Sequence, residues 1–170
     1  MNDTKQQKIR AMALFSALWL LVCTINAQAV EQAHSWYCKR TPNHTQPSLD
    51  TPMQFITEYG GYYLDTRHGD RCADKVVYLT FDAGYENGNV AKILDVLDKH
   101  NVKAAFFCTL DYLEDNPQLV HRMIDEGHIV GNHSTTHPNF TTITRTQMAE
   151  EIATLDNYLR EHFDYSSPYF

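Results

Sequence analysis

The sequence lacks an excess of positive charge. Its 14 lysines and arginines stand against 21 aspartates and glutamates, which gives a formal net charge of −7 at pH 7. It has no basic arm and no arginine cluster, the features through which proteins bind nucleic acids, so we expect no nucleic-acid partner. Internal repeats, low-complexity stretches and zinc-finger cysteine spacings are also missing, and 170 residues suit one domain.

Long apolar runs are scarce too, apart from a mostly apolar stretch over residues 11–25. This stretch is shorter than the ~20 residues that a membrane-spanning helix needs. Three basic residues precede it and Ala-Gln-Ala follows at 27–29, as in a secretory signal peptide (residues 1–29) cleaved after Ala29. We therefore expect an exported protein, extracellular, in the cell wall or periplasmic, with no stable membrane span after cleavage. An uncleaved anchor is the alternative.

Cysteine is rare, with four in the chain and three beyond the predicted signal peptide. An oxidising compartment permits disulfides, and the most economical pairing joins Cys38 to Cys72. Cys108 ends an apolar run and has no histidine beside it in sequence. We interpret Cys108 as a small buried residue rather than a nucleophile.

Strand and helix patterns alternate beyond residue 75. The preceding segment, residues 30–75, forms an irregular extension with three prolines, a short helix over 53–59 and a paired stretch over 62–64. Short connections between strand, helix and strand imply parallel pairing, hence an α/β sheet or the beginning of a barrel. The patterns predict strands at 76–81, 103–108 and 128–132, and helices that begin at the caps Asn89, Asn116 and Thr144, with Asn101 and Gly127 just past the ends of the first two.

Asp82 is the first charge after the apolar run 76–81, which is typical of a strand buried on both faces. Gly84 follows two residues later and permits a tight turn. Asp82 should therefore project from the carboxyl end of the strand, where α/β folds assemble their sites. The alternative is an aspartate that only caps the turn.

His133 and His137 follow the third predicted strand at a spacing of four residues. In a turn or a helix start, this spacing brings both rings to one side, where they can bind one cation. With nine histidines in the chain, two unrelated surface histidines could also show this spacing by chance. The joint pattern is more informative, because Asp82 and the pair follow two parallel strands and should meet at the same rim.

Two of these motifs resemble a known family. Residues 80–85 (Thr-Phe-Asp-Ala-Gly-Tyr) and 133–138 (His-Ser-Thr-Thr-His-Pro) are similar to the first two motifs of the polysaccharide deacetylases, carbohydrate esterase family four. Residues 83–89 and 36–45 look most like the branch that deacetylates N-acetylmuramic acid to form muramic lactam in spore-cortex peptidoglycan. The resemblance implies an α/β fold, the distorted (β/α) barrel of these enzymes. Residues 76–170 would form only its N-terminal part, so the barrel is expected to be incomplete.

The resemblance also implies a mechanism and a partner. Asp82 would be the general base, His133 and His137 the ligands of a divalent metal, expected to be zinc, and peptidoglycan glycan strands the substrate. Ala83 stands where the full family pattern has a second aspartate as a further ligand, so metal binding should be weakened.

The later family motifs, including the general acid, would lie beyond Phe170. We therefore expect an exported peptidoglycan deacetylase of which this chain is a fragment, inactive and unstable by itself. The alternative is a truncated, non-catalytic remnant that at most binds glycan or metal.

Overall fold

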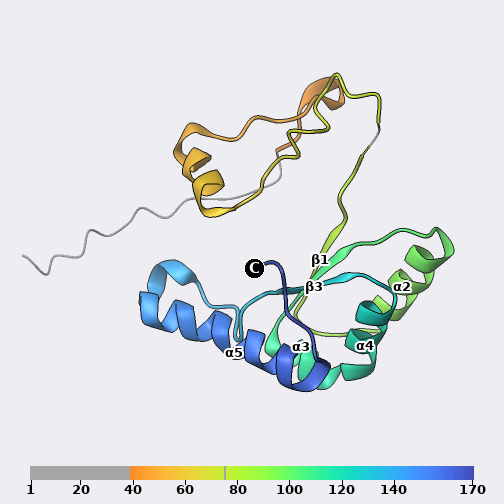
Figure 1. The fold of residues 1–170 in the computed structure, drawn as a ribbon, viewed down its shortest axis with the longest axis vertical. Helices are drawn as coiled ribbons and strands as arrows, with labels where there is room; N and C mark the ends of the chain where they lie inside the picture. Colours follow the sequence, from red (N-terminus) through yellow and green to blue (C-terminus); the bar gives the residue numbers. More distant parts are fainter. Residues whose placement is uncertain (1–38, 75) are drawn as a thin grey trace, which may run out of the picture. The chain divides into compact units, whose positions relative to one another are not determined.

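The structure, a computed structural model, describes residues 39–74 and 76–170 (Figure 1). The predicted signal peptide and Cys38 lie outside the described residues. Within the described ranges, no helix has both the length and the apolar composition to cross a membrane.

A three-stranded parallel sheet forms the centre of residues 76–170. Its strands are β1 (Thr80–Ala83), β2 (Ala105–Cys108) and β3 (Ile129–Asn132), in the order β1-β2-β3. The register places Asp82 beside Phe107 and Phe107 beside Gly131. The parallel α/β arrangement predicted from the strand and helix patterns is confirmed.

Helices connect the three strands, and two more helices follow β3, as Figure 1 shows. They comprise α2 (Val90–Lys99), α3 (Leu110–Asp115), α4 (Pro117–Asp125), the 3-10 helix η3 (Phe140–Thr142) and α5 (Arg145–Phe163). We did not predict α3, whose single turn and a half is too short for a periodic signal, although Tyr112 and Leu113 are fully buried. Between α2 and α4, Arg122 donates to the carbonyl of Ala91 and pairs with Asp95 at 2.8 Å.

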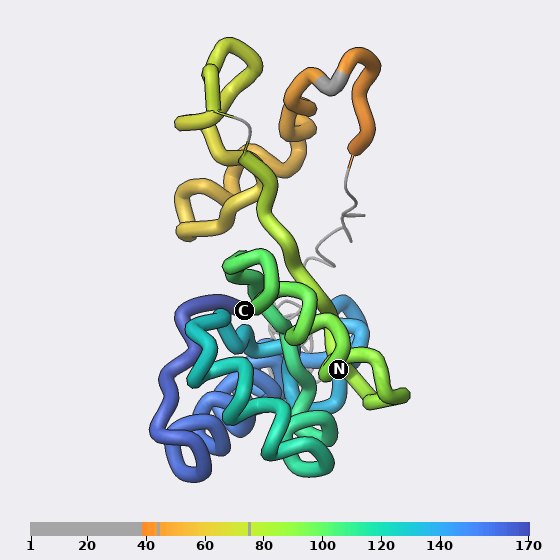
Figure 2. The backbone as a smooth tube through the Cα atoms, turned by 90° about the vertical axis from the view of Figure 1, so that its right-hand side faces the viewer, coloured from red at the N-terminus to blue at the C-terminus, as the bar shows by residue number. Residues whose placement is uncertain are grey.

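The core lies between the sheet and these helices. After α5 the chain returns to β3, where the carbonyl of Tyr169 accepts a hydrogen bond from the backbone N–H of Asn132 at 2.9 Å (Figure 2). The burial of apolar side chains between the sheet and the helices is the main force that holds these elements together. The fully buried apolar residues are Leu94, Phe106, Cys108, Tyr112, Leu113, Val120, Met123, Val130, Leu155 and Leu159.

Helix ends follow most of the sequence signals. Asn101 and Gly127 both have positive φ, 51° and 78°, just past α2 and α4. Thr144 and Gln147 form the predicted capping box of α5. Asn116 occupies the cap position of α4, but its side chain makes no capping hydrogen bond. The prediction for Asn89 is wrong in part in the same way, because Asn89 occupies the cap position of α2 but its side chain accepts no capping hydrogen bond. The carboxylate of Glu86 accepts from the backbone there instead.

The first predicted strand begins later than expected. Residues 76–79 lie outside β1, and the side chains of Val77 and Tyr78 are 79% and 63% exposed. Our expectation of a run buried on both faces is therefore wrong. The reason is that β1 pairs with β2 alone among the described strands. The side chains of residues 76–79 therefore have no neighbouring strand on the other side to pack against.

The extension, residues 39–74, contains the 3-10 helices η1 (Pro42–His44) and η2 (Thr51–Tyr59). The second contains the predicted short helix over 53–59, and Gly60, with a φ of 73°, caps its end. The predicted pairing of residues 62–64 is wrong, because no strand is present in the described part of the extension. The predicted Cys38–Cys72 disulfide involves a residue outside the described ranges, and Cys72 itself has a free thiol.

Candidate active site

Asp82 is the third residue of β1 and points to solvent. Its side chain is 71% exposed, whereas Phe81 and Ala83 on either side face the core. Phe81 stacks on Phe106 of β2 with ring centroids 5.0 Å apart, and the carbonyl of Ala83 accepts from the backbone N–H of Thr109 at 3.1 Å. Strand alternation together with these core contacts therefore fixes the direction in which Asp82 projects.

His133 comes directly after β3 and approaches Asp82. Its backbone N–H donates to the carbonyl of Cys108 at 3.0 Å, so the pairing with β2 continues for one residue beyond the strand. Its Nε2 lies 4.0 Å from Oδ2 of Asp82. The two outer strands thus bring together, at one end of the sheet, the aspartate and the first histidine that the sequence singled out.

His137 faces the same place through a tight turn rather than a helix. Its ring centroid lies 4.6 Å from that of His133, with 47° between the ring planes. Ser134 and His137 both have positive φ, 61° and 51°, and the backbone N–H of His137 donates to Oγ of Ser134 at 3.0 Å. Two left-handed residues thus bend the chain enough for both imidazoles to meet.

The ionisation of His133 suits metal binding. Burial of the ring lowers its pKa, an effect that Asp82 opposes and His137 reinforces. A lowered pKa keeps the imidazole neutral near pH 7, and the neutral ring is the form that binds metals.

Residues 133–137, which carry both histidines and are called the histidine turn below, are held against α5 by hydrogen bonds. Asn132, 1% exposed, donates through Nδ2 to the carbonyl of Ile152 at 2.9 Å and to Oδ1 of Asp156 at 2.8 Å. Its Oδ1 accepts from the backbone N–H of Ser134 at 2.8 Å. One buried amide therefore connects the end of β3, the turn and the helix.

Glu151 makes a second connection between α5 and the same turn. Its carboxylate accepts from the backbone N–H and the hydroxyl of Thr136 at 2.7 and 2.8 Å, and its carbonyl accepts from the hydroxyl of Thr135 at 2.8 Å. Sequence reasoning missed Asn132, Glu151 and Asp156, because these bonds join residues 15 to 24 positions apart and no local pattern marks them.

The turn after Asp82 is held by Glu86. One carboxylate oxygen accepts from the backbone N–H groups of Gly88, Asn89 and Val90, the last two at 2.8 and 3.4 Å. The other accepts from the hydroxyl of Tyr112 at 3.2 Å. Burial alone would raise the pKa of Glu86, but the backbone donors bring that pKa below its ordinary value. Glu86 is therefore an ionised cap on the first turn of α2.

Asp82, His133 and His137 form the rim of the sheet at this end, and they fit a divalent metal in part. Two neighbouring imidazoles, His133 and His137, offer ligand nitrogens, and Asp82 lies beside them. Ala83 has only a methyl group, and its side chain is buried. Among the described residues, three side chains that can bind a metal do lie close to one another in the extension. They are His68, Cys72 and Asp74.

Known proteins are similar to this chain in sequence and in fold. The sequence profile described as Polysaccharide deacetylase matches residues 69–170. The chain is 45% identical over 119 residues to the peptidoglycan-N-acetylmuramic acid deacetylase PdaA of Bacillus subtilis, covering 69% of this chain and 43% of PdaA. It is 44% identical over 140 residues to an uncharacterized 30.6 kDa protein of Geobacillus stearothermophilus, covering 82% of this chain and 51% of that protein.

A solved structure of Bacillus subtilis PdaA, described as a family 4 carbohydrate esterase, resembles the fold with a TM-score of 0.70 at 40% identity. The match covers 79% of this chain and 56% of the PdaA chain. The chain spans about half the length of the curated relatives it matches.

Proposed function

The chain belongs to the polysaccharide deacetylase family. On that premise we propose that it takes part in the metal-assisted hydrolysis of N-acetyl groups from peptidoglycan amino sugars. We propose N-acetylmuramic acid, in spore-cortex muramic lactam formation, as the substrate. The observation that supports this assignment best is the approach of His133 Nε2 to Asp82 at 4.0 Å, with His137 beside it. The similarity to a muramic acid deacetylase favours the muramic sugar.

His133 and His137 would hold a divalent metal, which we expect to be zinc because imidazole suits it. When bound, the metal would supply Lewis acidity toward the acetamide carbonyl and the attacking water. The bonds to α5, together with the bond from the backbone N–H of His137 to Ser134, hold the turn in which the two rings lie side by side. Ala83 provides no third protein ligand, so the affinity for metal should be low.

Asp82 would act as the general base. Its carboxylate is exposed and lies 4.0 Å from His133 Nε2, so it can accept the proton of a water that attacks beside the histidines. Proton transfer of this kind typically accelerates a reaction about 10²- to 10⁴-fold. Glu86 holds the turn that follows Asp82, which limits the positions that the carboxylate can take.

We also propose a domain organisation and a location. Residues 1–29 would be a cleaved signal peptide, 30–75 an extension and 76–170 the N-terminal part of the deacetylase domain. The protein would work outside the cytoplasmic membrane, at the peptidoglycan glycan strands of the cell wall.

The test compares variants of the full-length protein in two assays, release of acetate from muropeptides and metal binding by calorimetry. Asp82→Asn should retain metal binding and lose about 10²- to 10⁴-fold in turnover. His133→Ala and His137→Ala should lose both. Ala83→Asp should bind metal more tightly. His100→Ala, at the exposed end of α2, is the matched control and should change neither.

Two outcomes would overturn these roles. Undiminished turnover in both histidine variants would remove the metal assignment, and undiminished turnover in Asp82→Asn would leave Asp82 as a turn cap. Mass spectrometry of the digested products identifies the sugar that loses its acetyl group. Deacetylation confined to glucosamine residues would overturn the muramic acid assignment alone.

A further inference from the structure

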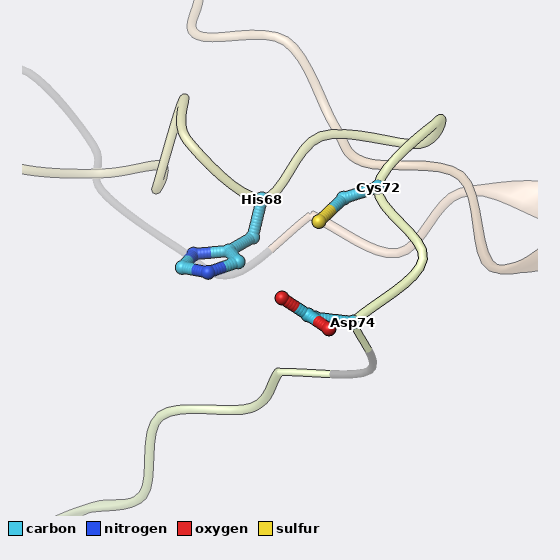
Figure 3. A group of neighbouring side chains, drawn as sticks. All are labelled: His68, Cys72 and Asp74. Carbon is cyan, nitrogen blue, oxygen red and sulfur yellow. The ribbon is translucent and has the colours of Figure 1, made fainter.

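Three side chains of different chemistry converge in the extension, upstream of β1. Figure 3 shows the sulfur of Cys72 and the carboxylate of Asp74 both directed toward the imidazole of His68. One potential ligand atom from each residue lies within 4.8 Å of the other two. An imidazole, a thiol and a carboxylate within seven positions make a donor set that zinc accepts.

The imidazole of His68 is already oriented for a metal. Its Nδ1 lies 2.6 Å from Oδ2 of Asp65, so Nδ1 carries the proton and donates it to that carboxylate. The lone pair of Nε2 is then available to a cation. A carboxylate behind the second ring nitrogen is the arrangement that fixes the tautomer and raises the basicity of metal-binding histidines.

Asp65 is itself held in place. Its carboxylate accepts from the hydroxyl of Tyr78, from His68, and from the backbone N–H and Nε of Arg67 at 2.9 and 3.1 Å. The carboxylate that accepts from His68 Nδ1 is therefore fixed in position by several donors, one of them the guanidinium of Arg67.

The backbone brings the other two ligands to the ring. The N–H of His68 donates to the carbonyl of Asp65, and the N–H of Cys72 donates to the carbonyl of Gly69 at 2.8 Å, which makes two consecutive turns. Cys72 has a free, partly exposed thiol, and Asp74 is exposed. A cation from solvent can therefore reach both.

We propose that residues 68–74 form a zinc site in which His68 Nε2, Cys72 Sγ and the Asp74 carboxylate bind one Zn²⁺, with water in the fourth position. The thiol releases its proton on binding, so one thiolate and one carboxylate neutralise the dication. Zinc bonds of about 2.0 to 2.3 Å place tetrahedral ligands about 3.5 Å apart, so the three side chains must close by about 1 Å. The site shares no residue with the rim of Asp82, His133 and His137, and it does not depend on the proposed function.

The test uses Co²⁺ as a probe in the reduced full-length protein. Bound Co²⁺ should show a thiolate-to-metal charge-transfer band and the visible bands of tetrahedral coordination, and Zn²⁺ should displace it. Cys72→Ser should abolish the charge-transfer band. His68→Ala should weaken binding at least 10-fold, and Asp65→Asn should weaken it about 10- to 100-fold while the band remains.

The matched controls are Cys38→Ser, Cys108→Ala and His133→Ala, each of which should keep the charge-transfer band. Circular dichroism shows whether each variant folds, and Asp65→Asn tests the site without removing a ligand. Absence of the band in the wild-type protein, its persistence in Cys72→Ser, or recovery of Cys72 in a disulfide from the purified protein would overturn the proposal.

Discussion

Replacing Asn132 by aspartate would remove one of the two connections between the histidine turn and α5 with almost no change of shape. In the native protein the amide nitrogen donates to the carbonyl of Ile152 and to Asp156, while the amide oxygen accepts from the backbone of Ser134. The substitution keeps the acceptor and replaces the donor by an oxygen. The bond to Ser134 survives, whereas both bonds to α5 are lost.

The magnitude follows from burial. Asn132 is 1% exposed, so water does not reach its side chain. The carbonyl of Ile152 and the carboxylate of Asp156 therefore lose their donor at a buried position. A buried polar group left without its partner costs about 1 to 3 kcal/mol. Asp156 is half-buried and can recover a water molecule, so we expect a loss of about 2 to 4 kcal/mol in the free energy of unfolding. Repulsion between the new carboxylate and Asp156 adds to this loss.

The assay is urea unfolding of the full-length protein, read as a shift of the midpoint at constant slope. Asp156→Asn is the matched variant, since the amide of Asn132 can still donate to an amide oxygen there. It should cost less than about 1 kcal/mol. Combining the two substitutions gives the new carboxylate a donor at position 156 and should recover part of the loss. Metal affinity at His133 and His137 should fall in Asn132→Asp and should recover in part in the double variant.

Two results would refute this reasoning. An unchanged midpoint in Asn132→Asp would show that the bonds to α5 contribute nothing to stability. A double variant no more stable than Asn132→Asp would show that the loss does not arise from the contact with Asp156.

Two further predictions concern the neighbouring elements. Glu86→Gln should cost about 1 kcal/mol at pH 7, because an ionised cap on α2 is lost. Since the pKa of Glu86 is lowered on folding, its contribution is present above the unfolded pKa and disappears as the pH falls through the folded pKa, so the difference between variant and wild type should vanish in acid; a difference that persists there would contradict the charge argument. Gly131→Ala should cost about 1 to 3 kcal/mol, because a Cβ there would lie 2.4 Å from the ring of Phe107; an unchanged midpoint of thermal unfolding would show that the ring moves aside freely.

Some features of the fold depend on residues close together in sequence, and these could be predicted. Asn101 and Gly127 stop two helices because each takes up a positive φ, and the capping box of Thr144 and Gln147 spans three positions. The parallel sheet follows from the alternation of apolar runs and helical patterns. The signals for Asp82 and His133 are of the same kind, since each ends an apolar run.

Other features depend on packing between distant segments. Glu86 displaced Asn89 as the cap of α2 because Tyr112, 26 positions away, holds the glutamate over the helix end. The exposure of residues 76–79 was set by the place of β1 at the edge of the described sheet, which hydrophobicity alone does not reveal.

The sequence by itself singled out candidate residues for the site: an aspartate and two histidines where apolar runs end, each within a motif that resembles the family. Only the tertiary structure decided how they meet. Parallel pairing of β1 and β3 with β2 brings Asp82 within 4.0 Å of His133, and Asn132 and Glu151 tie the histidine turn to α5. The physical reason is that a strand end is a local property of side-chain pattern, whereas a distance across the sheet is set by which strands pair and in what register.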